Sequence, residues 1–334
     1  MTDYLFALTD GGGTVPPELG VAHRLVTRGH RVRVLADASM AADVAAIDAE
    51  FLPWAPGRDD PAPASAYRDW ELRSPWALAG GMAEHMIAGP AAGHTHRLLE
   101  VVRTGAPDLG LAPVPGVWDQ VHRARRQLVL TARTFDFPAR LAPSVRYVGP
   151  VLDDPSWAHG ERWEPPAGDG PLVLVAMSST YQAQYATVRN VVDALTRSGA
   201  RGLVTVGPAL DPGLVRGGDG IVVVRSAPHA EVLDHVELVI THGGHGTVLK
   251  SLVAGRPMLV LPHGRDQRDN AARVTFRGAG EMLRRSATAD RIAAAANRVL
   301  HTPYYTAAAR WFGGRIRAEL ARSTLLAELE QRPA

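Results

Sequence analysis

The residues best suited to chemistry gather in one stretch, residues 241–270. It opens with a glycine-rich turn that follows the apolar run 238–240 and precedes a predicted helix over 248–254. A helix that begins at such a turn offers unpaired N–H groups and the positive end of its dipole, which favour a bound phosphate. Thr247 adds a hydroxyl donor and His242 an imidazole. The turn therefore predicts a phosphate or diphosphate site.

A second polar group follows the next predicted strand, residues 257–262. Asp266 and Gln267 come after it, and a carboxylate beside an amide can hydrogen-bond neighbouring sugar hydroxyls. Ligands of open α/β sheets collect at the carboxyl ends of strands, so the two groups are expected to meet there. The plain alternative is a buried βαβ turn in which His242 and His245 are structural. The Asp-Gln pair and its spacing favour the ligand site.

This block resembles the donor-binding signature of the inverting GT-B, family 1-like glycosyltransferases, which move sugars from UDP or dTDP onto small lipophilic acceptors. It is most similar to actinobacterial enzymes of natural-product (antibiotic) biosynthesis. The resemblance implies an α/β chain of the GT-B fold, with two Rossmann-like, doubly wound domains facing an interdomain cleft. The motif reads His242-x-Gly244-x-Gly246-Thr247, then Gly255-x-Pro257, then Asp266-Gln267-x-x-Asn270.

The resemblance also implies which residues bind the donor. Asp266 and Gln267 are expected to bind the sugar. The nucleobase is expected to bind at the turn Ser226, Ala227, Pro228 and His229, where the family has an aromatic-x-Pro-Gln turn. The diphosphate is expected to bind at the glycine-rich turn and at the loop after the predicted strand 172–177. The residues concerned are His242, Gly244, Gly246, Thr247, Ser179 and Thr180.

Two residues depart from the family pattern. Ser226 stands where relatives carry a large aromatic or apolar residue, which removes a stacking surface of about 1–3 kcal/mol. Lys250 stands where many relatives have a Glu that accepts from ribose hydroxyls, and an ammonium can only donate to those oxygens. Lys250 is instead suited to reach a phosphate.

The amino-terminal segment predicts a strand over 4–8, a loop, a helix over 18–28 and a strand over 31–36. Such a start is also typical of dinucleotide-binding domains, but Pro16 stands where their third glycine allows close helix packing. In the family this loop faces the acceptor, and its His is the general base. Here Thr14 occupies that position, directly after Gly13.

A threonine hydroxyl is a poor base near neutral pH. Three explanations stay open: Asp10 in the same loop deprotonates the acceptor, the acceptor is an acidic phenol or activated carbon, or the chain does not catalyse transfer. The predicted catalytic residues are therefore Asp10, Thr14 and His242. For Asp10 the alternative is a structural role in the turn.

The acceptor wall is predicted to contain Gly13, Trp70, Trp76 and His85. Further candidates from the same region are Trp54, Tyr67, His94 and His96. For the aromatic residues the alternative is a place in the core, and for the histidines a solvated or structural one.

The predicted organisation has an acceptor domain over 1–150, a linker over 151–170, a donor domain over 171–310 and a terminal helix over 311–334 that packs back on the first domain. The first domain looks shortened near 108–111, because Pro107-Asp108 adjoins a segment that relatives place a strand, a helix and a strand later. Either the sequence omits residues of the protein or the enzyme is shortened.

Composition agrees with a two-domain globular protein. The 334 residues are 46% hydrophobic and 21% charged, with a net charge of +2 and no dense basic block, so nucleic acid is not expected as a partner. The absence of cysteine excludes disulfides and thiol catalysis. No apolar run approaches the roughly 20 residues of a membrane helix and no signal peptide is recognised, so we expect a cytoplasmic protein.

The predicted function is metal-independent, inverting transfer of a sugar from a dTDP- or UDP-sugar to a small hydrophobic aglycone, with no cofactor besides that co-substrate. Homodimer formation is left open. One alternative is a noncatalytic GT-B-like partner of another glycosyltransferase, which the missing loop His favours. Another is a sugar-nucleotide epimerase, which needs several carboxylates where only Asp266 is evident.

Overall fold

The computed structural model describes residues 1–54, 94, 97–98, 100–102, 124–155, 158 and 163–331. Its first half contains a parallel sheet of β1 (Asp3–Ala7), β2 (Arg31–Ala36) and β3 (Glu50–Pro53). The helices of this part are α1 (Val15–Thr27) and α2 (Ala41–Ala45), the latter preceded by a 3-10 turn, Ala38–Met40. Two further strands, β4 (Gln127–Val129) and β5 (Val145–Tyr147), form a separate parallel pair.

The second half is built on one six-stranded parallel sheet with the order β11-β10-β9-β6-β7-β8. Its strands are β6 (Leu172–Ala176), β7 (Arg201–Thr205), β8 (Ile221–Val224), β9 (Leu238–Thr241), β10 (Met258–Val260) and β11 (Gly280–Met282). Its helices are α7 (Tyr185–Ser198), α8 (His229–Val232), α9 (His245–Val253), α10 (Gln267–Phe276), α11 (Ala289–His301) and α12 (Pro303–Leu320). A 3-10 turn, Pro212–Leu214, precedes β8.

Helices cover both faces of this sheet, as its uniformly apolar strands require. Alternate residues of β6 point to opposite faces: Val173 and Val175 pack in a cluster with α7 and α11, whereas Leu172 and Leu174 pack in one with α8, α9, α10 and α12. All five residues of β6 are buried. The central strand is therefore fixed by packing on both sides.

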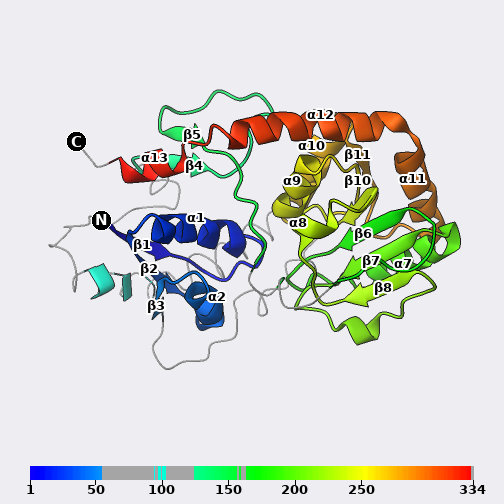
Figure 1. Ribbon diagram of the computed structural model, residues 1–334, viewed down its shortest axis with the longest axis horizontal. Helices are drawn as coiled ribbons and strands as arrows, with labels where there is room; N and C mark the ends of the chain where they lie inside the picture. The colour runs from blue at the N-terminus through cyan, green and yellow to red at the C-terminus, as the bar shows by residue number, and fades with distance from the viewer. Residues whose placement is uncertain are drawn as a thin grey trace.

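The strand order reverses at β6. The chain runs from β6 to β7 and β8 on one side, then returns to β9, which pairs with β6 on the other side. The loops that follow β6 and β9 therefore diverge at the carboxyl edge of the sheet and leave a crevice between them, which is where open α/β sheets bind ligands. In Figure 1, the helices α8 and α9, which follow β8 and β9, lie on the side of the second half that faces the first half.

The last helices join the two halves (Figure 1). From α12, which packs on α9, the chain continues to α13 (Leu325–Glu330), which lies on the first half. There Tyr4 Oη donates to the Leu329 carbonyl at 3.3 Å, and Glu330 forms an ion pair with Arg28 at 2.7 Å. Leu326 and Leu329 pack against the core beneath α1.

Three element bounds differ from the sequence predictions. Helix α1 starts at Val15 rather than residue 18, because prolines are tolerated in a first turn that lacks N–H partners. Helix α9 starts at His245, directly at the glycine-rich turn. The predicted terminal helix over 311–334 is interrupted after Leu320, where the Ser323 hydroxyl donates to the Val148 carbonyl at 2.6 Å. The turn redirects the chain onto the first half.

The predicted sheet of the first domain is only partly seen. Among the described residues, β1–β3 and β4–β5 are two sheets that share no hydrogen-bonded strand pair. The domain bounds stay predictions, and so does the shortening near 108–111, which falls outside the described residues. In the described part of the chain, no helix has the length and apolar character needed to cross a membrane.

Candidate functional site

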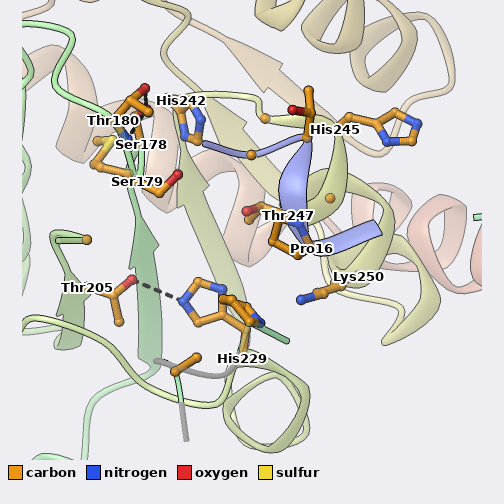
Figure 2. Close-up of a pocket in the computed structure, with 18 of the residues that line it drawn as sticks. Pro16, Ser178, Ser179, Thr180, Thr205, His229, His242, His245, Thr247 and Lys250 are labelled. Atoms are coloured by element: carbon orange, nitrogen blue, oxygen red, sulfur yellow. Dashed lines mark hydrogen bonds between the residues drawn. The ribbon is translucent and has the colours of Figure 1, made fainter. Parts of the chain in front are cut away.

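A pocket of about 240 Å³ lies where the loop after β1 faces the loops after β6 and β9. Thr14 and Pro16 line it from the first half, and Ser179 and His242 line it from the second. Figure 2 shows His242 beside the loop that carries Ser178, Ser179 and Thr180, with Thr247 and Pro16 close by. We call this the switch-point pocket, because it sits where the strand order reverses.

The amino terminus of α9 opens into the switch-point pocket. The first helical bond runs from Val248 N–H to the Gly244 carbonyl at 3.0 Å. Within the part of the chain that the structure describes, the N–H groups of His245, Gly246 and Thr247 have no backbone acceptor, and no side chain caps the helix. A Cβ built on Gly246 would meet no atom of the described residues within 4 Å, and Gly246 lines the pocket. The arrangement suits an anion.

His242 lies on the same turn and is neutral. Its Nδ1 is 3.4 Å from the Ala176 carbonyl, which can only accept, so Nδ1 carries the proton. Burial lowers the pKa of His242 to about 4, although the bond to Ala176 raises it. A Cβ on Gly244 would lie 2.7 Å from His242 Nε2, so glycine is needed for the ring to lie beside the helix start. An anion at the α9 terminus would favour protonation of this ring.

The loop after β6 forms the opposite wall. Ser178 Oγ accepts from the Thr180 N–H at 3.2 Å and lies 3.2 Å from the Thr180 hydroxyl, which gives the loop its turn. Gly12 packs directly against it: its φ is +70°, and a Cβ there would lie 2.3 Å from Thr180 Cγ2. Glycine at position 12 therefore brings the loop of the first half against the second half.

The predicted nucleobase turn lies at the far end of the pocket. Ser226 and Ala227 line the pocket and are buried, whereas Pro228 is buried without lining it. His229 lies 3.1 Å through Nε2 from the Thr205 hydroxyl, and that hydroxyl is also within 3.2 Å of the Val175 carbonyl (Figure 2). Burial lowers the pKa of His229 to about 4. The ring is therefore neutral, with Nε2 as the donor to Thr205.

Lys250 is not a free cation. Its Nζ donates to the Asp153 carbonyl at 3.1 Å and forms an ion pair with Asp154, whose side chain is 4% exposed. The Asp154 carboxylate also accepts from the Ala230 N–H at 3.0 Å. Burial raises the pKa of Asp154, and the ammonium of Lys250 then lowers it below the ordinary value. Lys250 is thus neutralised by a carboxylate of the linker, a pairing that sequence patterns could not reveal across a separation of 96 residues.

The two predicted sugar residues have different surroundings. Asp266 lines the pocket, is exposed, and accepts from Asn270 Nδ2 at 2.9 Å. Gln267 is 2% exposed, and its Oε1 accepts from His263 N–H while its Nε2 donates to Gln182 Oε1, both at 2.8 Å. Gln267 therefore braces the loop after β10, and its sugar contact stays a prediction. Asp266 keeps carboxylate lone pairs for a ligand.

On the first-half side, Gly13 and Thr14 line the switch-point pocket, but Asp10 does not. The Asp10 carboxylate accepts from Gly12 N–H at 3.1 Å and from the Ser39 hydroxyl at 2.8 Å. These bonds are those of a turn-forming aspartate, the structural alternative for this residue. Its role as a base stays a prediction.

Most predicted acceptor residues cannot be placed. Trp70, Trp76, His85, Tyr67 and His96 lie outside the described residues. Of the other candidates, Trp54 stacks on His94 at 4.2 Å between ring centroids and donates to the Leu8 carbonyl at 2.7 Å. Trp54 is thus tied to the end of β1.

Glu18 is a residue that sequence reasoning missed. It lies in the first turn of α1, directly after Pro17, which lines the pocket, but Glu18 itself is not a lining residue. Burial raises the pKa of Glu18 to about 7. A carboxyl group that titrates near neutral pH is suited to proton transfer. Its position in the sequence carried no motif, and only its burial reveals it.

The second half of the chain is similar in sequence to a known protein family. Residues 189–330 match the family described as Erythromycin biosynthesis protein CIII-like, C-terminal domain. The 4'-demethylrebeccamycin synthase of Lentzea aerocolonigenes is 28% identical over 215 residues, which span 62% of this chain and 49% of that protein. Demethyllactenocin mycarosyltransferase of Streptomyces fradiae is 30% identical over 156 residues, or 46% of this chain and 33% of that protein. The matched regions span about half or less of these curated relatives.

Solved structures show the same fold. Spinosyn rhamnosyltransferase SpnG complexed with thymidine diphosphate superposes with a TM-score of 0.74 at 20% identity, over 98% of this chain and 100% of that one. The glycosyltransferase SnogD from Streptomyces nogalater gives 0.73 at 20% identity, over 98% and 99% of the two chains. The predicted GT-B fold is therefore confirmed.

Proposed function

We propose that this chain, a GT-B protein with an EryCIII-like C-terminal domain over residues 189–330, is a glycosyltransferase of natural-product type. In this proposal a nucleotide sugar lies in the switch-point pocket and its sugar passes to a small lipophilic acceptor held by the first half. The observation that carries it is the open amino terminus of α9, whose amides and neighbouring His242 face the pocket. No metal is required by this proposal.

The reaction follows from the two-sided pocket. An acceptor oxygen attacks the anomeric carbon from the side of Thr14, the bond from that carbon to the diphosphate oxygen breaks, and inversion results. The acceptor proton passes to a base. The departing diphosphate gains charge where the α9 amides and His242 can stabilise it, and such preorganised donors are usually the largest catalytic contribution. Asp266 would hold the sugar hydroxyls during transfer.

For the donor we favour dTDP over UDP. The ion pair of Lys250 with Asp154 leaves no α9 carboxylate for the ribose 2'-hydroxyl. Thymidine diphosphate lacks the 2'-hydroxyl and keeps only the 3'-hydroxyl, so the exchange costs it fewer sugar contacts than it costs UDP. Two similar glycosyltransferase structures, VinC and SpnG, hold dTDP or thymidine diphosphate, which supports this choice.

Asp10 and Glu18 are the two candidate carboxylates for the general base, and experiment can distinguish them. Asp10 is held in the loop turn, whereas burial raises the pKa of Glu18 to about 7. If Glu18 is the base, turnover on an alcohol acceptor rises with pH through about 7, and Glu18→Gln removes that limb of the profile. If Asp10 is the base, Asp10→Asn abolishes turnover and Glu18→Gln leaves the profile unchanged.

A second candidate function is a noncatalytic partner of another glycosyltransferase. Thr14 at the position of the family's catalytic histidine favours it. The exposed Asp266 in the pocket opposes it, because a scaffold needs no sugar ligand. A noncatalytic partner would bind nucleotide weakly or not at all. Without the second protein, it would not transfer sugar from donor to acceptor.

Calorimetric titration of the full chain tests the proposal directly. We expect dTDP to bind without added metal, 2'-deoxy-UDP to bind more tightly than UDP, and GDP and NAD⁺ not to bind. The 2'-deoxy-UDP arm separates the missing hydroxyl from the thymine methyl group. Absence of binding by all pyrimidine nucleotides would contradict the proposal, and NAD⁺ binding would favour a dehydrogenase.

A further inference from the structure

A second pocket of about 430 Å³ lies apart from the switch-point pocket and shares no lining residue with it. It is formed by the β4–β5 connection, the residue that follows α10, and the outer side of α12. We call it the arginine pocket, because Arg133, Arg277 and Arg315 line it. Its size is within the range of small-molecule sites.

None of these three guanidinium groups has a carboxylate partner within the described residues. The two nearby carboxylates are engaged elsewhere. Asp136 accepts from Arg273 Nη2 at 2.7 Å and from the Tyr147 hydroxyl at 2.6 Å. Glu319 accepts the backbone N–H groups of residues 133 and 134, at 2.6 and 3.0 Å.

Asp136 remains ionised, because these donors lower its pKa even though burial raises it. Its charge is balanced by Arg273, which does not line the pocket. The three lining arginines therefore leave an uncompensated positive charge around one cavity. A bound anion would relieve it.

Arg277 has one hydrogen-bond donor, Nε, without an acceptor among the described residues. Its Nη2 donates to the Asp136 carbonyl at 2.6 Å, but its Nε is buried with no partner. A buried donor without an acceptor costs stability, and it costs more when the group is charged. Arg277 is one of the residues that line the arginine pocket, and a ligand acceptor that reached its Nε would recover part of that cost.

Aromatic rings lie between the arginines. Arg277 sits over the Phe312 ring at 5.1 Å and over the Phe276 ring at 5.8 Å, and Arg315 sits over the Trp311 ring at 5.1 Å. Trp311 is 56% exposed and Phe276 is 72% exposed. Exposed large aromatics beside a cavity are typical of ligand-binding surfaces.

We propose that the arginine pocket binds a small molecule that carries a carboxylate or phosphate on an aromatic body. Guanidinium groups bind both anions through paired N–H donors, and their planes stack on rings. The ligand's anion would lie among Arg133, Arg277 and Arg315, and its ring against Trp311. This inference does not depend on the proposed sugar transfer.

The test is calorimetric titration of the full chain with 1-naphthyl phosphate, 1-naphthoate and the neutral 1-naphthol, with and without saturating dTDP. We expect at least one anionic probe to bind at least about tenfold more tightly than 1-naphthol, since charge-assisted hydrogen bonds are stronger than neutral ones. Which anion binds more tightly identifies the site as one for phosphate or for carboxylate. Binding should persist when dTDP is present.

Variants locate the binding without reference to dTDP. Arg133→Gln and Arg315→Gln are expected to weaken the anionic probe at least about fivefold each. Arg322→Gln, an exposed arginine beyond the end of α12 and outside the pocket, is the matched control and should leave it unchanged. Equal binding of 1-naphthol, no saturable binding, or unchanged affinity in both pocket variants would overturn the proposal.

Discussion

The two pockets use opposite means to attract an anion. The switch-point pocket is lined by three cations, Arg225, Lys250 and Arg265, and by three carboxylates, Asp153, Asp154 and Asp266, so its formal charges cancel. Its attraction comes from helix amides and a neutral imidazole. The arginine pocket is lined by three cations and one aspartate that another arginine already balances.

This difference bears on what each pocket can do. Fixed dipoles at a helix start need no counter-ion and act where charge develops during a reaction, as a departing diphosphate requires. Exposed guanidinium groups hold a ligand whose charge is constant, and salt screens them. The first arrangement suits chemistry, and the second suits binding.

The largest expected effect separates sugar binding from nucleotide binding within the switch-point pocket. Asp266→Asn should lower turnover about a hundredfold, because a charged hydrogen bond to the sugar in the transition state is lost. The affinity for dTDP should change less than about threefold. Steady-state kinetics and calorimetry measure the two quantities. Asp269→Asn, an exposed aspartate on the same helix, serves as control, and equal losses in turnover and dTDP affinity would remove Asp266 from the sugar site.

The next effect is a pH dependence that only the switch-point pocket should have. Burial lowers the pKa of His242 to about 4, and a bound diphosphate would raise it. At pH values between the pKa of the free protein and that of the complex, binding therefore takes up a proton. Affinity for dTDP-glucose, whose diphosphate does not itself titrate in this range, should rise on the order of tenfold from pH 8 to pH 5. Calorimetry in buffers of different ionisation enthalpy counts the proton.

His242→Gln should abolish this proton uptake while keeping a polar side chain on the turn. Probe binding at the arginine pocket should show no such uptake with 1-naphthoate. An unchanged proton count in His242→Gln would mean that another group titrates.

The smallest effect is the response to salt. Raising the salt concentration from about 0.05 to 0.5 M shortens the screening length severalfold, and exposed charge pairs feel it most. We expect the anionic probe at the arginine pocket to weaken about fivefold and dTDP-glucose less than twofold. If the affinities of the two ligands fell equally with salt concentration, recognition by helix dipoles in one pocket and by guanidinium charges in the other would be contradicted.

The sequence predicted the second half well because its signals are local. The turn at 242–247 carries its glycines, threonine and histidine within six positions, and the strand order then places it beside residues 178–180. Strand periodicity and the prolines around 257–262 were likewise sufficient for β10. The prediction of α9 was late by one turn, since a helix start without a side-chain cap has no residue signature.

What the sequence missed depends on distant partners. Nothing near Lys250 indicates that Asp154 neutralises it, and nothing near Gln267 indicates that its amide is consumed by His263 and Gln182. The arginine pocket assembles residues from three separate segments, none of which has a motif. Such sites follow from packing, and single-sequence patterns do not contain them.

The crossing of α12 to α13 has a consequence for synthesis of the chain. Tyr4 receives its contact from Leu329, 325 residues later, and Leu326 covers the core beneath α1. Because domains generally fold in the order in which they are made, the first half must wait with this apolar surface uncovered until the second half is complete. The last part of the first half's core is thus synthesised only after the second half can fold, and a chain interrupted before α13 would leave the apolar surface of α1 and β1 exposed to aggregation.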